Sequence, residues 1–376
     1  MIIGIDGNEA NVGNKVGIGQ YASELLSQLS KFQTSTTKFQ IYLKNDPNEH
    51  MPKESENWQY TKVGPRKLWT QIGLPFHLYT TKNKPDVFFS PTHYAPRFCP
   101  VPSVISVMDM SFEYFPELFA TKDLHQLQNW TRYSAKNAAK ILTISEASKN
   151  DIIKFYEVPK DKVVVTHLGI RQDLGNKKET INMEKLSEKY NVSKPYILFV
   201  GTLQPRKNIE RLIEAFSQLK LQNEKIQDVD LVIIGKKGWL YEPILAAPEK
   251  FNVVESVKFL DFVTDEDLPA FYKNAECFVL PSLYEGFGLP ILEAMKYDCP
   301  VVTSNISSLP EAGGDAAIYC DPEDVHDIAK QIEKVVTDTN LRSDMIKKGR
   351  EQIKKFSWKK SAEQTLEVLQ QIVKQK

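Results

Sequence analysis

Short apolar runs alternate along the chain with stretches in which apolar residues recur every three or four positions. The recurring positions predict amphipathic helices, as in the face formed by Ile18, Tyr21 and Leu25. The short runs predict strands over residues 1–6, 39–43, 86–90, 104–108, 141–145, 163–167, 196–201, 231–235, 257–260, 277–280, 300–303 and 316–319. Strands that alternate with helices predict parallel sheets covered by helices on both faces.

A polar stretch from about Gly169 to Lys194 interrupts this alternation, which then starts again. A chain of 376 residues is also long for one core and suits two. The predicted fold class is therefore α/β, with two Rossmann-like, doubly wound domains. We place them at residues 1–175 and 176–357, and predict a C-terminal helix over residues 358–376 with an apolar side formed by Trp358, Ala362, Leu366 and Leu369.

Composition narrows the class of protein. The 48 Lys and Arg residues balance the 48 Asp and Glu residues, which disfavours a long nucleic-acid groove. No apolar run reaches the length of a membrane span, and residues 1–6 do not resemble a secretion signal, so we expect a cytoplasmic protein. Four scattered cysteines without a Cys-x-x-Cys pair predict neither a disulfide framework nor a zinc site.

Ligands of doubly wound sheets bind beyond the carboxyl ends of the strands, so the loops there are the candidate sites. The first loop, residues 7–20, contains Gly17 and Gly19 directly before a helix, where main-chain N–H groups can meet an anion. A turn that only needs glycine explains this loop equally well.

The second loop, residues 201–208, reads Gly-Thr-Leu-Gln-Pro-Arg-Lys-Asn and precedes an amphipathic helix with Asn208 at its N-cap. Arg206 can form a bidentate contact with phosphate oxygens, and Lys207 adds a second positive charge. Adjacent Arg and Lys residues more often lie in a basic loop that is exposed to solvent. The position at the ligand-binding edge of the sheet favours a diphosphate site.

The third loop, residues 281–290, is the most informative. Gly286 and Gly288 open the backbone, and Pro290 suits the first turn of a helix. Glu285 and Glu293 are eight positions apart, and two carboxylates on such a turn can hold separate hydroxyl groups. A surface charge or a helix-dipole contact explains either residue alone, but not the pair together with the loop.

Glu285-Gly-Phe-Gly-Leu-Pro to Glu293 resembles the Glu-x7-Glu motif of retaining GT-B glycosyltransferases. Residues 201–208 look like the phosphate loop of that family, and the resemblance continues over most of the chain. It is closest to bacterial mannosyltransferases of polysaccharide and lipopolysaccharide assembly. The matching segments outside the two loops are residues 90–94, 143–146 and 308–311.

The resemblance implies two domains facing a central cleft, with the C-terminal helix returning to the first domain. Glu285 would contact the donor sugar, and Glu293 would contact the ribose of the nucleotide. Arg206 and Lys207 would neutralise the leaving diphosphate. The other implied donor contacts are Gly17, Gly19, Gly201, Phe287, Gly288, Leu289 and Val263, the last of these near the base.

Two positions depart from the family pattern. Thr202 stands where many relatives have Arg, and Met108 stands where many have His. Asp109 and His93 are the candidates to replace that histidine, although a single His near a strand end is more often structural. In the family's favoured front-face mechanism the leaving phosphate takes the acceptor proton. We see no clustered Asp-x-Asp ligand pair of the kind that metal-dependent transferases use, and expect no obligatory metal or other cofactor.

The sequence therefore predicts a hexosyltransferase (EC 2.4.1.-) that uses a nucleotide-sugar donor, with GDP-mannose favoured over a UDP-sugar. The acceptor would be a sugar or a lipid-linked glycan. A catalytically impaired nucleotide-sugar-binding subunit and a related nucleotide-sugar epimerase or phosphorylase remain alternatives.

Peripheral contact with the inner face of the membrane is a further alternative. Two segments combine basic residues with a tryptophan, one around Trp69 and one around Trp358. A solvated helix face is the more common explanation of such charge runs. The basic residues are Arg66, Lys67 and Lys82 in the first segment, and Lys347, Lys348, Arg350, Lys354, Lys355, Lys359 and Lys360 in the second.

Overall fold

The computed structural model describes residues 1–13, 15, 17–171, 183–193 and 195–375. The chain forms two compact units, residues 1–169 with 357–376, and residues 170–356. The domain boundary expected at residues 175 and 176 lies outside the described residues, as do Asn14 and Val16 of the first candidate loop.

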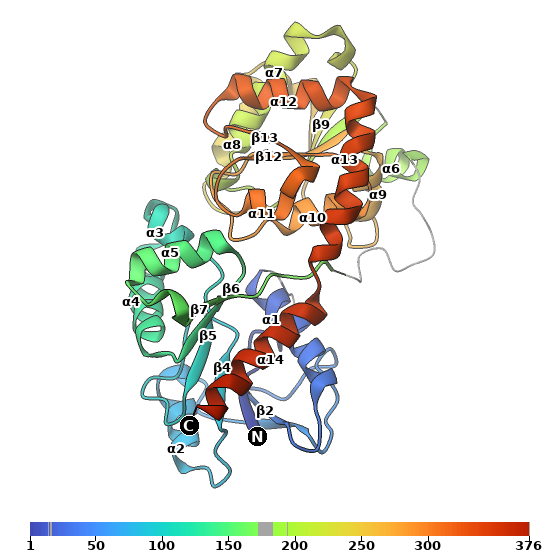
Figure 1. The fold of residues 1–376 in the computed structure, drawn as a ribbon. Helices are drawn as coiled ribbons and strands as arrows, with labels where there is room; N and C mark the ends of the chain where they lie inside the picture. Colours follow the sequence, from blue (N-terminus) through green and yellow to red (C-terminus); the bar gives the residue numbers. More distant parts are fainter. Residues whose placement is uncertain (14, 16, 172–182, 194, 376) are drawn as a thin grey trace. The chain divides into compact units, whose positions relative to one another are not determined.

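The first unit is built on a parallel sheet with the strand order β3-β2-β1-β4-β5-β6-β7, and helices cover both of its faces (Figure 1). Its strands are β1 (Ile2–Asp6), β2 (Lys38–Leu43), β3 (Trp58–Lys62), β4 (Val87–Ser90), β5 (Ser103–Ser106), β6 (Lys140–Thr143) and β7 (Val163–Val165). Its α-helices are α1 (Ile18–Leu29), α2 (Leu74–Thr80), α3 (Ser111–Tyr114), α4 (Thr121–Asn137), α5 (Glu146–Tyr156) and α14 (Trp358–Lys374).

The second unit repeats the architecture with the order β10-β9-β8-β11-β12-β13. Its strands are β8 (Tyr196–Val200), β9 (Asp230–Ile234), β10 (Val257–Leu260), β11 (Cys277–Leu280), β12 (Val301–Ser304) and β13 (Ala317–Cys320). Its α-helices are α6 (Met183–Tyr190), α7 (Ile209–Gln222), α8 (Glu242–Lys250), α9 (Leu268–Asn274), α10 (Leu289–Lys296), α11 (Leu309–Gly313), α12 (Val325–Thr337) and α13 (Thr339–Gln352).

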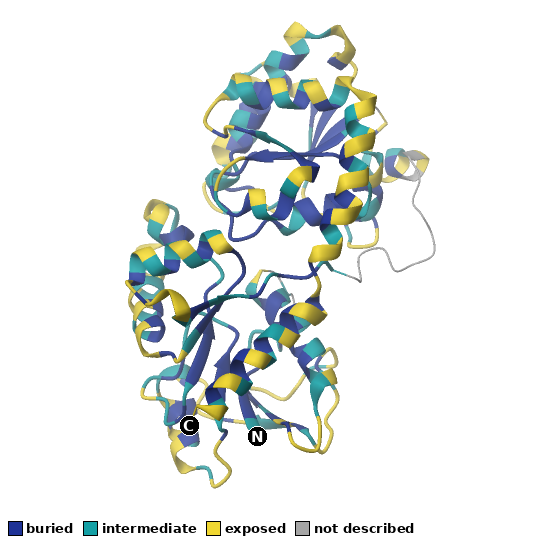
Figure 2. Cartoon of the chain, in the orientation of Figure 1, coloured by how far each residue is buried: buried dark blue, intermediate teal, exposed yellow. Residues whose placement is uncertain are grey.

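The central strands are buried on both faces, as the dark sheets inside each unit show (Figure 2). This explains why they appear in the sequence as continuous apolar runs. One strand, β3, was missed. In its sequence, Trp58-Gln-Tyr-Thr-Lys62, only Trp58 is buried, because β3 is an edge strand paired only with β2.

The C-terminal helix α14 belongs to the first unit and packs against α1. The rings of Tyr21 and Trp358 are 6.2 Å apart. Gly169 lies so close to this point that a Cβ atom there would be 2.1 Å from the main-chain nitrogen of Trp358. A glycine is therefore required where the chain leaves the first unit.

Both sheets have a topological switch point, where consecutive connections leave in opposite directions. In the first unit it lies between β1 and β4, and in the second between β8 and β11. The carboxyl ends of adjacent parallel strands diverge into a crevice at such a point, and ligands of open α/β sheets bind there. The loops after β8 and β11 are the second and third candidate loops of the sequence.

Asn208 holds these two loops together instead of capping α7 through its side chain. Its backbone has a φ of 60° and its side chain makes no cap hydrogen bond, contrary to the expectation. The amide donates to the carbonyl oxygens of Pro281, at 2.9 Å, and Pro322, at 2.7 Å. Asparagine suits this position because it tolerates a left-handed backbone and supplies two donors.

Replacing Asn208 by Ala should lower the free energy of unfolding by about 2–4 kcal/mol, because two buried carbonyls lose their donor and alanine disfavours this backbone. Urea unfolding monitored by tryptophan fluorescence measures the loss. Asn252→Ala is the matched control, since Asn252 has a φ of 58° and an exposed side chain. We expect it to cost about 1 kcal/mol. Equal losses in the two variants would contradict the linking role of Asn208.

Candidate active site

The loops after β8 and β11 are bound to each other through main-chain and side-chain contacts. The nitrogen of Leu283 donates to the oxygen of Arg206 at 2.9 Å. The guanidinium Nη1 of Arg206 donates to the oxygen of Tyr284 at 2.5 Å. Both loops therefore form one surface at the switch point of the second sheet.

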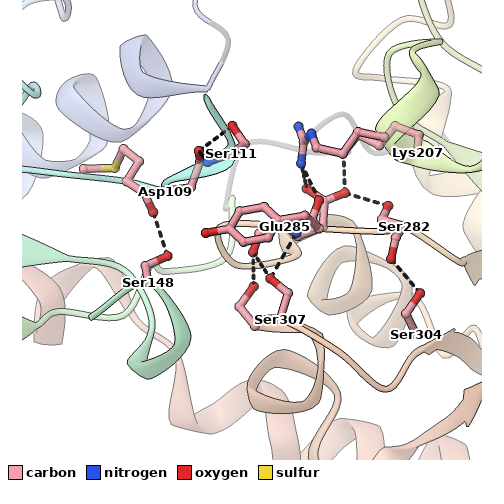
Figure 3. Close-up of polar contacts among 12 residues, drawn as sticks. Asp109, Ser111, Ser148, Lys207, Ser282, Glu285, Ser304 and Ser307 are labelled. Atoms are coloured by element: carbon pink, nitrogen blue, oxygen red, sulfur yellow. Dashed lines mark hydrogen bonds and ion pairs between the residues drawn. The ribbon is translucent and has the colours of Figure 1, made fainter. Parts of the chain in front are cut away.

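Glu285 lies at the centre of this surface, in contact with both predicted cations (Figure 3). Its Oε1 accepts from Nζ of Lys207 at 2.5 Å and from Oγ of Ser282 at 2.8 Å. Its Oε2 lies 3.2 Å from Nη1 of Arg206. The cations are not solvated, since the exposed fractions of their side chains are 14% for Arg206 and 12% for Lys207.

The charge state of Glu285 follows from these contacts. Burial by itself raises the pKa of a carboxyl, but Lys207 and Arg206 outweigh burial and lower the pKa of Glu285 to about 2. The side chain is therefore ionised throughout the neutral range. Two positive groups and one carboxylate leave the cluster with one positive charge in excess, which favours an anionic ligand.

Serine hydroxyls fix the main chain of Glu285, although none of these serines was predicted as a site residue. Ser307 and Ser308 both donate to the oxygen of Glu285, at 2.5 and 2.8 Å, and Oγ of Ser307 accepts from its nitrogen at 3.2 Å. Ser304 donates to the oxygen of Ser282 at 2.8 Å. Among them only Ser308 had a signal in the sequence, through the matching segment 308–311.

The glycine-rich turn adopts the predicted form. Gly288 has a φ of 101°, and Pro290 lies in the first turn of α10. A side chain at Gly288 would have its Cβ 2.9 Å from Leu309, so both the backbone and the packing require glycine. Phe287 is buried, with its ring 5.3 Å from that of Phe356, while Leu289 is half-buried.

Glu293 lies on α10 and is buried in a different environment. Burial raises its pKa, and the nearby positive charge of Arg171 only partly opposes this. The hydroxyl of Tyr272 donates to Oε2 of Glu293 at 3.2 Å. The two acidic residues of the motif therefore have pKa values displaced in opposite directions, and Glu285 is not the surface charge of the simpler interpretation.

Gly201 and Val263 lie at the carboxyl edge of the same sheet. The nitrogen of Gly201 donates to the oxygen of Ile234 at 2.9 Å, which aligns the start of the loop with β9. Val263, in the loop after β10, is buried beside the exposed Phe262. Lys236, in the loop after β9, lies 5.4 Å from the centre of the Phe262 ring and was not predicted.

The remaining predicted residues belong to the first unit. Gly17, with a φ of 51°, is the N-cap of α1, and Gly19 is buried in its first turn. His93 lies in the loop after β4, and its Nε2 accepts from the nitrogen of Met108 at 3.4 Å. Burial lowers the pKa of His93, while the neighbouring Asp109 partly opposes this.

Asp109 is engaged in a local hydrogen-bond pattern. Its Oδ1 accepts from the nitrogen and the hydroxyl of Ser111, at 2.9 and 2.7 Å (Figure 3). The hydroxyl of Ser148 donates to the oxygen of Met108 at 3.1 Å. Nδ1 of His93, in contrast, is buried and has no hydrogen-bond partner among the described residues.

Metal ligation has no obvious location in the described part of the chain. Those residues contain no group of three or more His, Cys, Asp or Glu side chains that could hold an ion. All four cysteines are free thiols, and Cys277, Cys299 and Cys320 are buried as expected.

Comparison with solved structures identifies the fold. Over 98% of this chain, the fold is similar to that of Anabaena HepE in complex with UDP-glucose, with a TM-score of 0.72, 18% identity and 99% of that chain covered. The two doubly wound units therefore form a GT-B glycosyltransferase fold, which confirms the predicted fold class.

Sequence comparison identifies the family to which the chain belongs. Residues 182–352 match the model of the glycosyl transferases group 1. The chain is 34% identical to O-antigen chain mannosyltransferase B of Escherichia coli over 75% of its own length and 74% of that protein. It is also 34% identical to serotype-specific mannosyltransferase WbdA of Escherichia coli, over 62% of this chain but only 29% of WbdA. The chain belongs to the group 1 family of glycosyltransferases.

Replacing Glu285 by Gln should remove a contribution to stability that depends on pH. The folded pKa of about 2 is below the usual 4.5, so ionisation of Glu285 stabilises the folded state above pH 4.5. This contribution is lost as the pH falls from 4.5 towards 2. The lowering of this pKa from 4.5 to about 2 corresponds to about 3 kcal/mol of the free energy of unfolding at neutral pH.

Urea unfolding of the wild type and of Glu285→Gln at several pH values tests this expectation. The difference in unfolding free energy should be constant above about pH 5 and should shrink at lower pH. Glu255→Gln, at an exposed position, is the control and should leave stability nearly unchanged at every pH. A Glu285→Gln difference that stays the same down to about pH 3 would be incompatible with the ion pairs.

Proposed function

We propose that this protein is a retaining mannosyltransferase that transfers mannose from GDP-mannose to a hydroxyl group of a growing bacterial polysaccharide. The observation that carries the proposal is the buried cluster of Glu285, Arg206 and Lys207 at the switch point of the second sheet. The choice of mannose and of a polysaccharide acceptor is supported by the similarity to the O-antigen chain and serotype-specific mannosyltransferases.

The charge of the leaving group is the main chemical problem in this reaction. As the bond to the sugar breaks, negative charge develops on the diphosphate, and fixed positive groups lower the energy of that state. Arg206 and Lys207 supply two positive charges in a largely buried setting, where the interaction is stronger than in water. The leaving phosphate would accept the proton of the attacking hydroxyl, as expected for a front-face mechanism with retention.

Glu285 would bind hydroxyl groups of the donor sugar. Its low pKa keeps it an acceptor at neutral pH, and the serine hydroxyls hold its main chain in place. Glu293 would bind the ribose hydroxyls, and the main chain of residues 287–289 would contact the donor. Val263 would lie near the base.

In the first unit, Gly17 and Gly19 would offer main-chain contacts to the donor. His93 and Asp109 would lie near the acceptor. His93 is suited to a polar ligand because its buried Nδ1 has no partner among the described residues.

A panel of donors tests the proposed reaction. Purified protein is incubated with GDP-mannose, UDP-glucose, UDP-N-acetylglucosamine and ADP-glucose, each with a mannose-containing glycan acceptor. We expect transfer from GDP-mannose and an α-linked product by NMR. Preferred transfer from a UDP-sugar would overturn the donor assignment, and a lack of turnover with every donor would favour a binding subunit.

In the same assay Glu285→Gln should reduce kcat by about a hundredfold or more, because a charged contact to the reacting sugar is lost. The exposed control Glu255→Gln should keep wild-type kcat. Circular dichroism at the assay temperature establishes that both variants are folded. Wild-type kcat in Glu285→Gln would refute the role of this carboxylate.

Glu293→Gln should raise the KM for the donor by about tenfold to a hundredfold while changing kcat little, because a charged hydrogen bond to the ribose is worth about 1.5–3 kcal/mol. Titration calorimetry with GDP should show the same loss. The control Tyr272→Phe removes the hydroxyl next to Glu293 but keeps the carboxylate and the ring, so GDP affinity should change at most a few-fold. Unchanged GDP affinity in Glu293→Gln would assign Glu293 to the core alone.

A further inference from the structure

A short helical segment of the first unit has apolar side chains on both its inner and its outer face. It consists of the turn Trp69–Gly73 and helix α2, Leu74–Thr80, which follow each other directly. Trp69, Leu74 and Leu78 are buried on the inner side in an apolar cluster. The other members of this cluster are Tyr42, Val63, Phe88 and Val101.

Four large apolar side chains on the segment are exposed. The exposed fractions are 59% for Leu68, 54% for Ile72, 68% for Phe76 and 53% for Tyr79. The spacing of four and three positions places Ile72, Phe76 and Tyr79 on one side of the helical segment, and Leu68 directly precedes the segment. We call these four residues the apolar face. The packing of the inner side does not require these exposed side chains to be apolar. Exposed apolar patches of this kind mark interaction surfaces.

Leu68 has an unfavourable backbone as well as an exposed side chain. Its φ of 52° lies in the left-handed region, which is rare for a residue of this size. Strained residues persist where the surrounding structure imposes them, and they are frequent at functional surfaces. The strain at Leu68 is therefore a second unusual feature at the start of the apolar face.

The sequence around the apolar face carries charges of one sign. From Asn57 to Pro85 the sequence has no Asp or Glu, although the whole chain has zero net charge. Lys67, Lys82 and Lys84 are exposed, and none of them forms an ion pair with a described residue. The basic residues of the stretch are Lys62, Arg66, Lys67, Lys82 and Lys84. Lys62 pairs with Asp46 at 2.8 Å, so the unpaired positive charge is that of Lys67, which directly precedes the apolar face along the chain, and of Lys82 and Lys84, which follow it.

The basic segment around Trp358 differs from the segment around Trp69. Trp358 is buried, and the cations near it are largely paired with acidic residues of their own unit. The pairs are Lys348 with Asp344, Arg350 with Asp298, Lys354 with Glu351 and Lys359 with Glu363. Trp358 is therefore not part of an exposed surface of basic and aromatic residues.

Trp69 is buried like Trp358. Its Nε1 donates to the oxygen of Val63 at 2.9 Å. The neighbours of Trp69 carry the exposed apolar surface instead.

We propose that the apolar face docks this protein onto a bilayer surface that contains anionic lipids. Leu68, Ile72 and Phe76 would enter the boundary between headgroups and acyl chains, and Tyr79 suits the same depth because its ring is amphipathic. The surrounding lysines would contact lipid phosphates. A second copy of the chain is a poorer occupant, because a two-fold interface would bring two positively charged surfaces together.

Co-sedimentation of the full chain with vesicles tests this docking. We use vesicles of equal parts phosphatidylcholine and phosphatidylglycerol, and vesicles of phosphatidylcholine alone. Binding should require the anionic lipid and should weaken at high salt. The double variant Ile72→Ser, Phe76→Ser should bind vesicles at least about tenfold more weakly than the wild type, because two apolar side chains no longer enter the bilayer. Lys82→Gln should weaken binding about fivefold.

Leu221→Ser is the matched control, because Leu221 is 84% exposed and lies on α7 of the other unit. It should bind vesicles like the wild type. Thermal unfolding shows whether each variant is folded, and donor turnover without lipid is a separate measurement, since the docking does not rest on the proposed function. Wild-type vesicle binding by the double variant, or no binding by the wild type at low salt, would overturn the proposal. Self-association through Phe76 without lipid would assign the face to a second copy.

Discussion

The ion pairs of Glu285 with Lys207 and Arg206 are the interaction on which the candidate site depends. A carboxylate that is almost removed from water is tolerated only when positive groups and hydrogen-bond donors compensate its charge. Here the compensating groups come from a loop nearly eighty positions earlier in the chain. The pairs therefore hold two loops together and at the same time concentrate positive charge at one place on the sheet.

The position of this cluster follows from the topology of the second sheet. Strands β8 and β11 are neighbours, but the chain leaves them in opposite directions. Their loops are free of a covering crossover at this point and can approach each other. The buried strands form a rigid base, so the loops can carry charged and strained residues without weakening the core. Asn208 and Gly288, both with positive φ, lie in these loops.

The two acidic residues of the motif show how environment separates similar groups. Glu285 has cations within reach and a lowered pKa, whereas Glu293 is surrounded by the core and has a raised pKa. Pairs of carboxyls whose environments displace their pKa values in opposite directions commonly have different roles. This difference is consistent with the separate sugar and ribose contacts that we propose for Glu285 and Glu293.

The sequence by itself determined the type of fold and the location of the important loops. Buried parallel strands are continuous apolar runs and their helices have a helical period, so both are encoded locally. The turn around Gly288 and Pro290 could also be predicted from the sequence, because those residues have strong backbone preferences. The edge strand β3 was not predicted, since only one of its five residues, Trp58, is buried.

Only the tertiary structure decided which side chains meet and which are exposed. It paired Glu285 with two cations and with distant serines, and it directed the amide donor of Asn208 to the carbonyl oxygens of Pro281 and Pro322. It also buried Trp69 and left Phe76 exposed, although both are apolar residues of one segment. Local periodicity describes the neighbours of a residue along the chain, whereas burial and pairing depend on segments that become neighbours only when the sheet assembles.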